Sequence, residues 1–260
     1  MTGTDLVYAA ELLKAGRLVA IPTETVYGLA GNAFDTVAVS DIFAVKHRPT
    51  FDPLIVHTWC LERMQALVGD FPPDAQRLAV DFLPGPLTLL LPKAEAIPDI
   101  VTAGSPLVAV RIPRHPLTLR LLEMLDFPLA APSANPFGYI SPTTAAHVER
   151  QLGDKIPYIL DGGPCTVGLE STIVGFVDGR PVIYRKGGVS VEAIEAVVGK
   201  VAVRPHSSSN PLAPGMLKSH YAPHTPILLG DISAILKANA GRRVGVMVVS
   251  RAARCFAVAG

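Results

Sequence analysis

The sequence predicts an α/β fold, in which short buried strands alternate with helices. Apolar runs bounded by proline, such as residues 53–58 (PLIVHT), are typical of buried strands that end where proline offers no N–H to the strand ladder. Segments with apolar side chains at helical spacing, such as residues 5–15, lie between these runs. With 49% hydrophobic and 17% charged residues, a chain of 260 residues can bury a substantial core.

Start and stop signals define the elements of the N-terminal half. Thr4 is a candidate N-cap for the helix at residues 5–15, and Gly16 is the candidate residue that ends it, because glycine readily adopts the left-handed conformation found after many helices. Pro22 ends a buried run at residues 18–21 (LVAI). The other elements expected here are a helix over residues 36–46, a strand over 53–58, helical segments over 59–83 interrupted at 71–73 (FPP), strands over 84–92 and 106–113, and a helix over 115–125.

The C-terminal half begins with residues 128–135 (PLAAPSAN), where a buried strand is again followed by proline and a polar loop. Ser141 followed by Pro142 predicts the start of a helix that runs to Leu152, since serine is a good N-cap and proline suits the first helical position. The remaining elements expected are a strand over residues 157–160, a hairpin of 171–176 with 181–185, and a helix from Ser190 to Val198.

The composition changes at residues 204–225, which are rich in proline and serine and are expected to be a linker that follows a main domain of residues 1–203. Beyond the linker, an apolar run (PILLG), a helix at residues 231–239 and a second apolar run (RVGVMVVS) predict the beginning of a β-α-β unit. Two strands and one helix rarely bury enough surface to be stable alone. Residues 226–260 are therefore expected to begin a second, incomplete domain, or to lean on the first.

The bulk properties narrow the class of protein. A formal net charge of +1 argues against strong non-specific binding of nucleic acid. The three cysteines (Cys60, Cys165 and Cys255) lie far apart, so they indicate neither a zinc site nor a disulfide framework. The N-terminus lacks the pattern of a signal peptide, and no apolar run approaches the roughly 18 residues of a membrane helix. We expect a cytoplasmic protein without a membrane segment.

Polar side chains follow several of the predicted buried strands. Thr25 follows the first strand, His57 and Arg111 each end a later one, and Ser133 and Asn135 come after another. Open α/β sheets bind ligands at the ends of their strands. These side chains are therefore expected to gather along one edge of the sheet. The sequence contains no G-x-G-x-x-G and no P-loop, so any nucleotide would have to be held differently.

Two pairs of polar residues, one cationic and one in the loop after a predicted strand, can each be interpreted as a ligand contact or as ordinary structure. Lys46 and Arg48 could neutralise a triphosphate, or they could complement a helix dipole and face water, which the spacing alone favours. Ser133 and Asn135 could contact phosphate or ribose, or they could be ordinary turn residues before a proline, and these alternatives are about equally supported.

The strand-end residues are equally ambiguous. A lone histidine such as His57 is more often a satisfied core residue than a ligand. Arg111 suits a carboxylate, because a guanidinium is hard to bury unpaired. For Ser171 an ordinary strand-edge hydroxyl is the favoured interpretation. Arg185 could approach a phosphate or stack on a base, or it could be a solvated loop cation. Tyr221 could be an ordinary linker residue or part of a cap over a cleft.

A series of ordered motifs resembles the YrdC-like threonylcarbamoyl-adenylate synthases over about residues 5–200. The motifs are PTETVYGL, KHRP, PLIVH, PGPLTLLLP, VAVRIPRHP, APSAN, SPTTAAHV, GLESTIV and RKGG. The segment APGMLKSHYAP, residues 213–223, resembles the two-domain branch of this family, which adds a Rossmann-like C-terminal domain. The fold implied by the resemblance is a twisted, mostly parallel sheet with helices and a large cleft, closed over by the linker.

The resemblance implies roles for individual residues. It places an L-threonine site at Thr25, His57, Arg111, the backbone of Ala131, and Ser171. It places catalytic positions around the triphosphate and bicarbonate at Lys46, Arg48, Ser133 and Asn135. It places the ATP contacts at Arg48, Asp52, the backbone of Leu107, Ser133, Ser141, Arg185 and Tyr221.

The implied activity is the formation of threonylcarbamoyl-adenylate and pyrophosphate from L-threonine, bicarbonate and ATP, with Mg²⁺ that accompanies ATP and is not held by a dedicated protein site. The implied partners are a tRNA-modifying threonylcarbamoyl transferase complex and, through it, tRNA. Asp52 stands where the family often has asparagine, and a carboxylate beside phosphates repels them unless Mg²⁺ or an arginine intervenes.

Two other functions remain open from the sequence. One is a carbamoyl-adenylate-forming relative, although the acylphosphatase and zinc-finger segments that normally accompany it have no room or cysteines here. The other is a double-stranded-RNA- or tRNA-binding module without synthase activity, against which the net charge of +1 argues.

Overall fold

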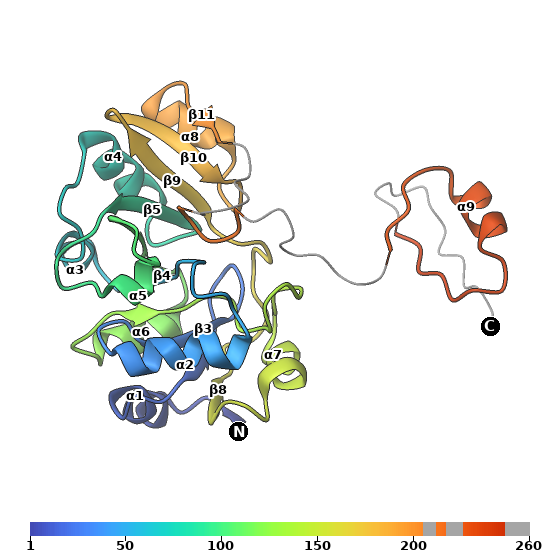
Figure 1. The fold of residues 1–260 in the computed structure, drawn as a ribbon, viewed down its shortest axis with the longest axis horizontal. Helices are drawn as coiled ribbons and strands as arrows, with labels where there is room; N and C mark the ends of the chain where they lie inside the picture. Colours follow the sequence, from blue (N-terminus) through green and yellow to red (C-terminus); the bar gives the residue numbers. More distant parts are fainter. Residues whose placement is uncertain (205–211, 217–225, 248–260) are drawn as a thin grey trace. The chain divides into compact units, whose positions relative to one another are not determined.

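Figure 1 shows the computed structural model, which describes residues 1–204, 212–216 and 226–247. The chain divides into two units, Met1–Ala222 and Pro223–Gly260. Among the described residues, no helix is long and apolar enough to cross a membrane.

The first unit is built on one eleven-stranded sheet with helices along it, which confirms the predicted α/β class (Figure 1). Its helices are α1 (Leu6–Lys14), α2 (Thr36–Lys46), α3 (Leu61–Gln65), α4 (Pro73–Phe82), α5 (Asp99–Thr102), α6 (Pro116–Glu123), α7 (Ala145–Leu152) and α8 (Val191–Val198). Its strands are β1 (Thr2–Gly3), β2 (Val19–Ile21), β3 (Gly28–Asn32), β4 (Ile55–His57), β5 (Leu87–Pro92), β6 (Leu107–Arg111), β7 (Leu129–Ala130), β8 (Tyr158–Leu160), β9 (Thr172–Val177), β10 (Arg180–Arg185) and β11 (Ala202–Val203).

The spatial order of the strands is β1-β8-β2-β3-β7-β4-β6-β5-β9-β10-β11. Parallel neighbours are β1 and β8, β8 and β2, β4 and β6, β5 and β9, and β10 and β11. Antiparallel neighbours are β2 and β3, β3 and β7, β7 and β4, β6 and β5, and β9 and β10. The register of the pair β4 and β6 sets two predicted site residues, His57 and Arg111, directly beside each other.

The two faces of the sheet carry different cores, because successive residues of a strand point to opposite faces. On β4, Val56 belongs to the large core under α2, α4, α7 and α8, whereas Ile55 belongs to a smaller cluster on the other face. That other face is covered in two places. One cover is formed by α1 and α6, and the second by residues 212–216, whose Ala213 and Met216 are buried against the sheet.

Most elements lie where the sequence predicts them, and α2 has the predicted bounds. Three details of the predictions are wrong. The N-cap of α1 is Asp5 and not Thr4, since the Asp5 carboxylate accepts a hydrogen bond from the Tyr8 N–H at 3.0 Å. The helix expected from Ser141 begins at Ala145, because Thr144 supplies the cap for the His147 N–H.

The third error concerns the second unit. Its helix α9 (Ile232–Ala238) lies within the predicted range and is capped by Asp231. The flanking runs expected to be strands are not strands in the described residues 226–230 and 243–247. Leu229 is 95% exposed there, so the apolar run has no neighbouring strand to cover it in the part of the chain that the structure describes. Residues 248–250 of the second run lie outside the described residues.

Candidate functional site

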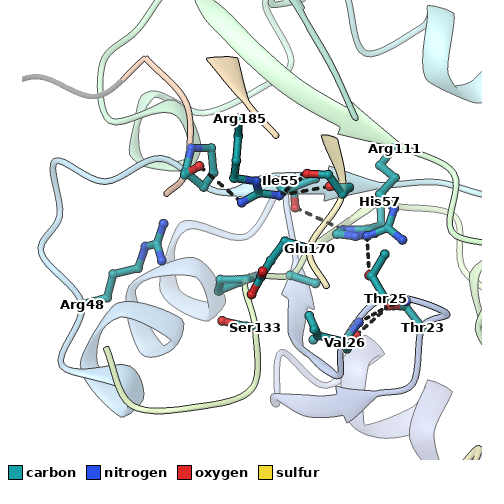
Figure 2. Close-up of a pocket in the computed structure, with 15 residues that line it drawn as sticks. Thr23, Thr25, Val26, Arg48, Ile55, His57, Arg111, Ser133, Glu170 and Arg185 are labelled. Carbon is teal, nitrogen blue, oxygen red and sulfur yellow. Dashed lines mark hydrogen bonds between the residues drawn. The ribbon is translucent and has the colours of Figure 1, made fainter. Parts of the chain in front are cut away.

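A cavity with about 520 Å³ of space, part of it open to solvent, lies on the sheet face that carries Ile55 (Figure 2). Its lining combines strand ends and loops that are far apart in the sequence. The lining residues are Thr23, Thr25, Val26, Gly28, Arg48, Ile55, His57, Arg111, Ala131, Pro132, Ser133, Glu170, Ser171, Arg185 and Pro214. Eight predicted site residues are among them: Thr25, Arg48, His57, Arg111, Ala131, Ser133, Ser171 and Arg185.

The two-residue period of the strands explains why His57 and Arg111 point into the cavity. Ile55 and His57 occupy the same face of β4, and Ala109 and Arg111 occupy the same face of β6. The residues between them, such as Val56, point to the opposite face and fill the large core. The parallel register then brings the imidazole and the guanidinium side by side at the ends of the two strands.

Arg111 is buried and held from several directions. Its Nε donates to the carbonyl oxygen of Gly85 at 3.1 Å, and its Nη1 donates to Thr25 Oγ1 at 3.0 Å. Its Nη2 lies 2.8 Å from Glu24 Oε1, an ion pair whose side chains are only 4% and 2% exposed. Burial lowers the pKa of Arg111, and the negative charge of Glu24 opposes this shift. The guanidinium therefore stays charged and has a fixed orientation.

His57 is a neutral side chain beside this cation. Burial, and after it the positive charge of Arg111, lowers the pKa of His57 to about 3. Its Nδ1 lies 3.2 Å from the carbonyl oxygen of Ile55, and the backbone of Leu129 is a second hydrogen-bond neighbour of the ring. An uncharged imidazole can offer a ligand hydrogen bonds without adding a second positive charge next to Arg111.

The loop after β2 presents two threonine hydroxyls. Thr23 Oγ1 donates to the carbonyl oxygen of Val26 at 2.6 Å and accepts from the N–H groups of Thr25 and Val26. This side chain fixes the turn in the way that serine and threonine hydroxyls stabilise local backbone loops. Thr25 Oγ1 lies 2.8 Å from Thr23 Oγ1 and also accepts from Arg111, so the loop and the strand end form one connected unit.

Lys46 and Arg48 do not face water, so the interpretation that the spacing alone favoured is wrong. Lys46 is 1% exposed, and its ammonium donates to the carbonyl oxygens of Ser133 and Asn135. Burial, followed by the charge of Arg48, lowers the pKa of Lys46 well below its usual range. Lys46 thus ties the end of α2 to the loop after β7, and that loop carries Ser133 into the cavity.

Arg48 reaches the cavity from a second buried ion pair. Its Nη2 lies 2.9 Å from Asp52 Oδ2, and it also donates to the backbone carbonyls of Asp52 and Pro53. Asp52 is fully buried, and burial raises the pKa of its carboxyl group, while Arg48 and Lys46 lower it in part. Asp52 therefore contacts an arginine of the cavity without lining the cavity itself.

Arg185 and Ser171 form the opposite wall. The guanidinium of Arg185 donates twice to the carbonyl oxygen of Ser171, at 3.1 and 2.9 Å, and once to its hydroxyl at 3.1 Å. Its Nη1 donates to the carbonyl oxygen of Pro214 at 3.3 Å. Part of the segment predicted to be a linker thus contacts this wall, and Pro214 itself lines the cavity.

The remaining predicted residues lie near the cavity or outside the described chain. Asn135 donates from Nδ2 to the carbonyl oxygens of Pro136 and Tyr139, and it does not line the cavity. Leu107 lies at the first position of β6, away from the lining. The prediction for Tyr221 falls on residues that the structure does not describe.

Sequence reasoning missed Glu170, the one carboxylate among the lining residues that the structure describes. Figure 2 shows its side chain between Ser133 and Arg185. Its Oε1 accepts a hydrogen bond at 2.5 Å from Ser141 Oγ, so Ser141 acts on the cavity through Glu170. In the sequence, Glu170 is distinguished only by its position directly before Ser171. A single glutamate before a strand does not by itself indicate a binding residue.

The cavity can bind an anionic ligand beside a small polar one. Arg48, Arg111 and Arg185 present three guanidinium groups, which bind carboxylates and phosphates with directional hydrogen bonds. Thr25 and the neutral His57 form a smaller pocket around Arg111. Fold and cavity together define an α/β protein with a cation-rich small-molecule site.

Comparison with known proteins shows which family this is. Residues 11–187 match the Sua5/YciO/YrdC family model, described as "Telomere recombination", and residues 189–257 match the model described as "Threonylcarbamoyl-AMP synthase, C-terminal domain". The chain belongs to the Sua5/YciO/YrdC family.

The relatives carry a consistent name. The threonylcarbamoyl-AMP synthase of Pyrococcus abyssi is 45% identical over 85% of this chain, and that of Bacillus subtilis is 43% identical over 97%. The chain spans 66% and 76% of the length of these two relatives. A crystal structure of P. abyssi Sua5 complexed with L-threonine is similar with a TM-score of 0.83 and 43% identity, over 86% of this chain and 68% of that one.

Proposed function

We propose that this chain is an L-threonylcarbamoyladenylate synthase, which converts L-threonine, bicarbonate and ATP into threonylcarbamoyl-adenylate, pyrophosphate and water. The observation that carries the proposal is the convergence of eight predicted substrate residues on one cavity. The relatives named threonylcarbamoyl-AMP synthase support the same activity. The product would serve a transferase complex that modifies tRNA.

The threonine subsite lies around Arg111 in this proposal. The guanidinium holds the carboxylate of L-threonine, because a fixed arginine recognises carboxylates well. Thr25 and the neutral His57 lie beside it and are placed to contact the side-chain hydroxyl. The relative crystallised with L-threonine supports an amino-acid site in this fold.

The nucleotide subsite lies on the side of Arg48, Ser133 and Arg185. Arg48 and Arg185 neutralise the triphosphate, and the hydroxyl of Ser133 is available for a phosphate oxygen. Lys46 holds the loop that carries Ser133. Mg²⁺ would enter with the phosphates of ATP, since this ion usually keeps several waters and takes few protein ligands. Among the described residues, no group of three or more His, Cys, Asp or Glu side chains gathers as a metal site.

The reaction proceeds by positioning and charge neutralisation. The amine of L-threonine, once deprotonated, attacks the carbon of bicarbonate or of an activated form of it, and loss of water leaves a carbamate. A carbamate oxygen then attacks the α-phosphorus of ATP, and the bond to the departing pyrophosphate breaks. The side chains described above bind and orient the reactants, and the arginines stabilise the charge that builds on the phosphates.

The experiment that tests this function measures pyrophosphate release from ATP. The wild-type protein should release pyrophosphate only when both L-threonine and bicarbonate are present. Lys46→Ala and Arg48→Ala should abolish this release, and Lys200→Ala should not, because the Lys200 side chain is 95% exposed and its ion pair with Glu195 is long, at 3.6 Å. Wild-type release by both of the first two variants, or release without threonine, would refute the proposal.

A further inference from the structure

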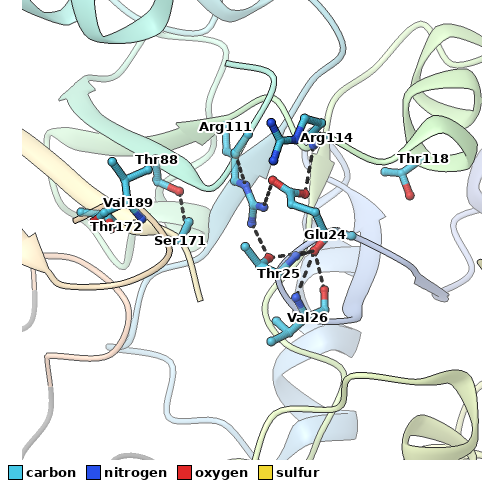
Figure 3. Close-up of polar contacts among 12 residues, drawn as sticks. Glu24, Thr25, Val26, Thr88, Arg111, Arg114, Thr118, Ser171, Thr172 and Val189 are labelled. Atoms are coloured by element: carbon cyan, nitrogen blue, oxygen red, sulfur yellow. Dashed lines mark hydrogen bonds and ion pairs between the residues drawn. The ribbon is translucent and has the colours of Figure 1, made fainter. Parts of the chain in front are cut away.

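Glu24 is a buried carboxylate that neither the motifs nor the lining of the cavity explains. It follows Thr23 in the loop after β2, and it is 3% exposed. Its Oε1 lies 2.8 Å from Arg111 Nη2, and its Oε2 accepts a hydrogen bond at 2.9 Å from the backbone N–H of Arg114 (Figure 3). One side chain thus joins the loop after β2, the end of β6 and the turn that follows β6.

The contacts of Glu24 leave part of the Arg111 guanidinium for a ligand. Nε is used by the carbonyl oxygen of Gly85, and Nη1 is used in part by Thr25. Nη2 is paired with Glu24 Oε1 at 2.8 Å. Because a guanidinium has five N–H donors, these three contacts engage only part of it. Arg111 lines the cavity and Glu24 does not. Glu24 therefore balances the charge of Arg111 and limits its rotation without occupying the binding space.

We propose that Glu24 is a positioning residue for the amino-acid substrate, which acts through Arg111. The carboxylate aims the guanidinium at the cavity, and it compensates a charge that would otherwise be buried alone. The inference rests on the proposed function, since it takes L-threonine as the ligand of Arg111. It also accounts for the loop residue that lies between the two threonines already described, Thr23 and Thr25.

The geometry of Glu24 predicts how its substitutions differ. Gln has one acceptor oxygen, so it cannot accept from Arg114 and also face Arg111 with an oxygen. Asp keeps the charge, but its side chain is one methylene shorter and cannot reach both partners. Both Glu24→Gln and Glu24→Asp should therefore misplace the guanidinium, and the Asp variant should be the milder one because it preserves the charge.

The test is equilibrium binding of L-threonine and of ATP, each alone, by calorimetry, together with the KM for each substrate. Glu24→Gln should weaken L-threonine binding by about 10- to 100-fold, as expected for a displaced binding group, and should leave ATP binding within about twofold. In a protein that already carries Arg111→Lys, the guanidinium that Glu24 orients is absent. Adding Glu24→Gln to that variant should therefore weaken L-threonine binding little further. Glu195→Gln, which removes the carboxylate that pairs with the exposed Lys200 outside the cavity lining, is the matched control.

Each other outcome contradicts the proposal in a recognisable way. If Glu24→Gln weakens the binding of L-threonine and of ATP equally and also lowers the melting temperature, Glu24 is a general structural residue. If Glu24→Gln does not fold, the same measurements on the milder Glu24→Asp variant decide the question. Unchanged L-threonine binding in both variants would remove any role for Glu24 in the site. If the wild-type protein does not bind L-threonine, the proposed function itself fails.

Discussion

Acidification should destabilise this protein through His57 in a way that can be isolated. The pKa of the buried imidazole is about 3, whereas an unfolded histidine titrates near 6.5. Because the folded pKa is depressed, the stabilisation by neutral His57 is fully present above pH 6.5 and is lost as the pH falls from 6.5 toward 3. Each pH unit in this window costs about 1.4 kcal/mol of the free energy of unfolding.

The size of the effect follows from the two pKa values. Between pH 7 and pH 4.5 the contribution of His57 should fall by about 2.5 kcal/mol, and by pH 3, where the folded imidazole is itself half protonated, the total loss should reach about 4 kcal/mol. The physical cause is the cost of a second positive charge placed in a buried site next to Arg111.

Urea unfolding of the wild-type protein and of His57→Asn, at several pH values from 7 to 4.5, measures this contribution. The variant has no titrating group at this position, and every other group, including His115, titrates in both proteins. The difference between their free energies of unfolding should therefore shrink by about 2 to 3 kcal/mol as the pH falls. A difference that stays constant over this range would show that His57 is not a buried neutral imidazole.

Three further variants test other parts of the site. Lys46→Met should lower the free energy of unfolding in urea by about 2 to 3 kcal/mol, because two buried carbonyls lose the donor that they share. An unchanged urea midpoint would contradict this. Because the pKa of Asp52 is raised, the stabilisation from its protonated form is present at low pH and is lost as the pH rises. Asp52→Asn should therefore gain stability relative to the wild type from pH 4 to 7. A difference in the free energy of unfolding that does not change with pH would contradict this prediction. Glu170→Ala should raise the KM for ATP several-fold through Ser141 and leave L-threonine binding unchanged, and the reverse pattern would place Glu170 in the amino-acid subsite.

Local patterns are enough to predict the elements that begin and end with strong signals. The helix over residues 36–46 is confirmed with its predicted bounds, and its N-cap Asp35 accepts hydrogen bonds from the N–H groups of Val37 and Ala38. The strand β3 was missed, because its sequence GLAGN has little β-propensity. Gly31 explains this sequence, since a Cβ at this position would lie 2.9 Å from Leu18 Cδ2. Close packing between elements selects glycine there, and a single sequence does not reveal such packing.

The same limit applies to the candidate site. Thr25, His57 and Arg111 could be predicted to gather because each follows a buried strand, and the cavity confirms that they do. The burial of Lys46 could not be predicted, because the carbonyls that bind its ammonium lie 87 and 89 residues away in the sequence. The partner of Arg111 was missed for the same reason. Nothing local to Glu24 indicates a cation 87 residues later, since that contact exists only after β2 and β6 have entered the same sheet.

The cavity arises from an incomplete cover on one face of the sheet, and this explains why its polar residues can stay charged. The face that carries Val56 is filled by a continuous apolar core, where a guanidinium would have no partner. The opposite face has separate covers, one from α1 and α6 and one from residues 212–216. Arg111 and Arg48 reach this second face already paired with Glu24 and Asp52. A change in either carboxylate should therefore affect ligand binding through its arginine, even though neither carboxylate lines the cavity.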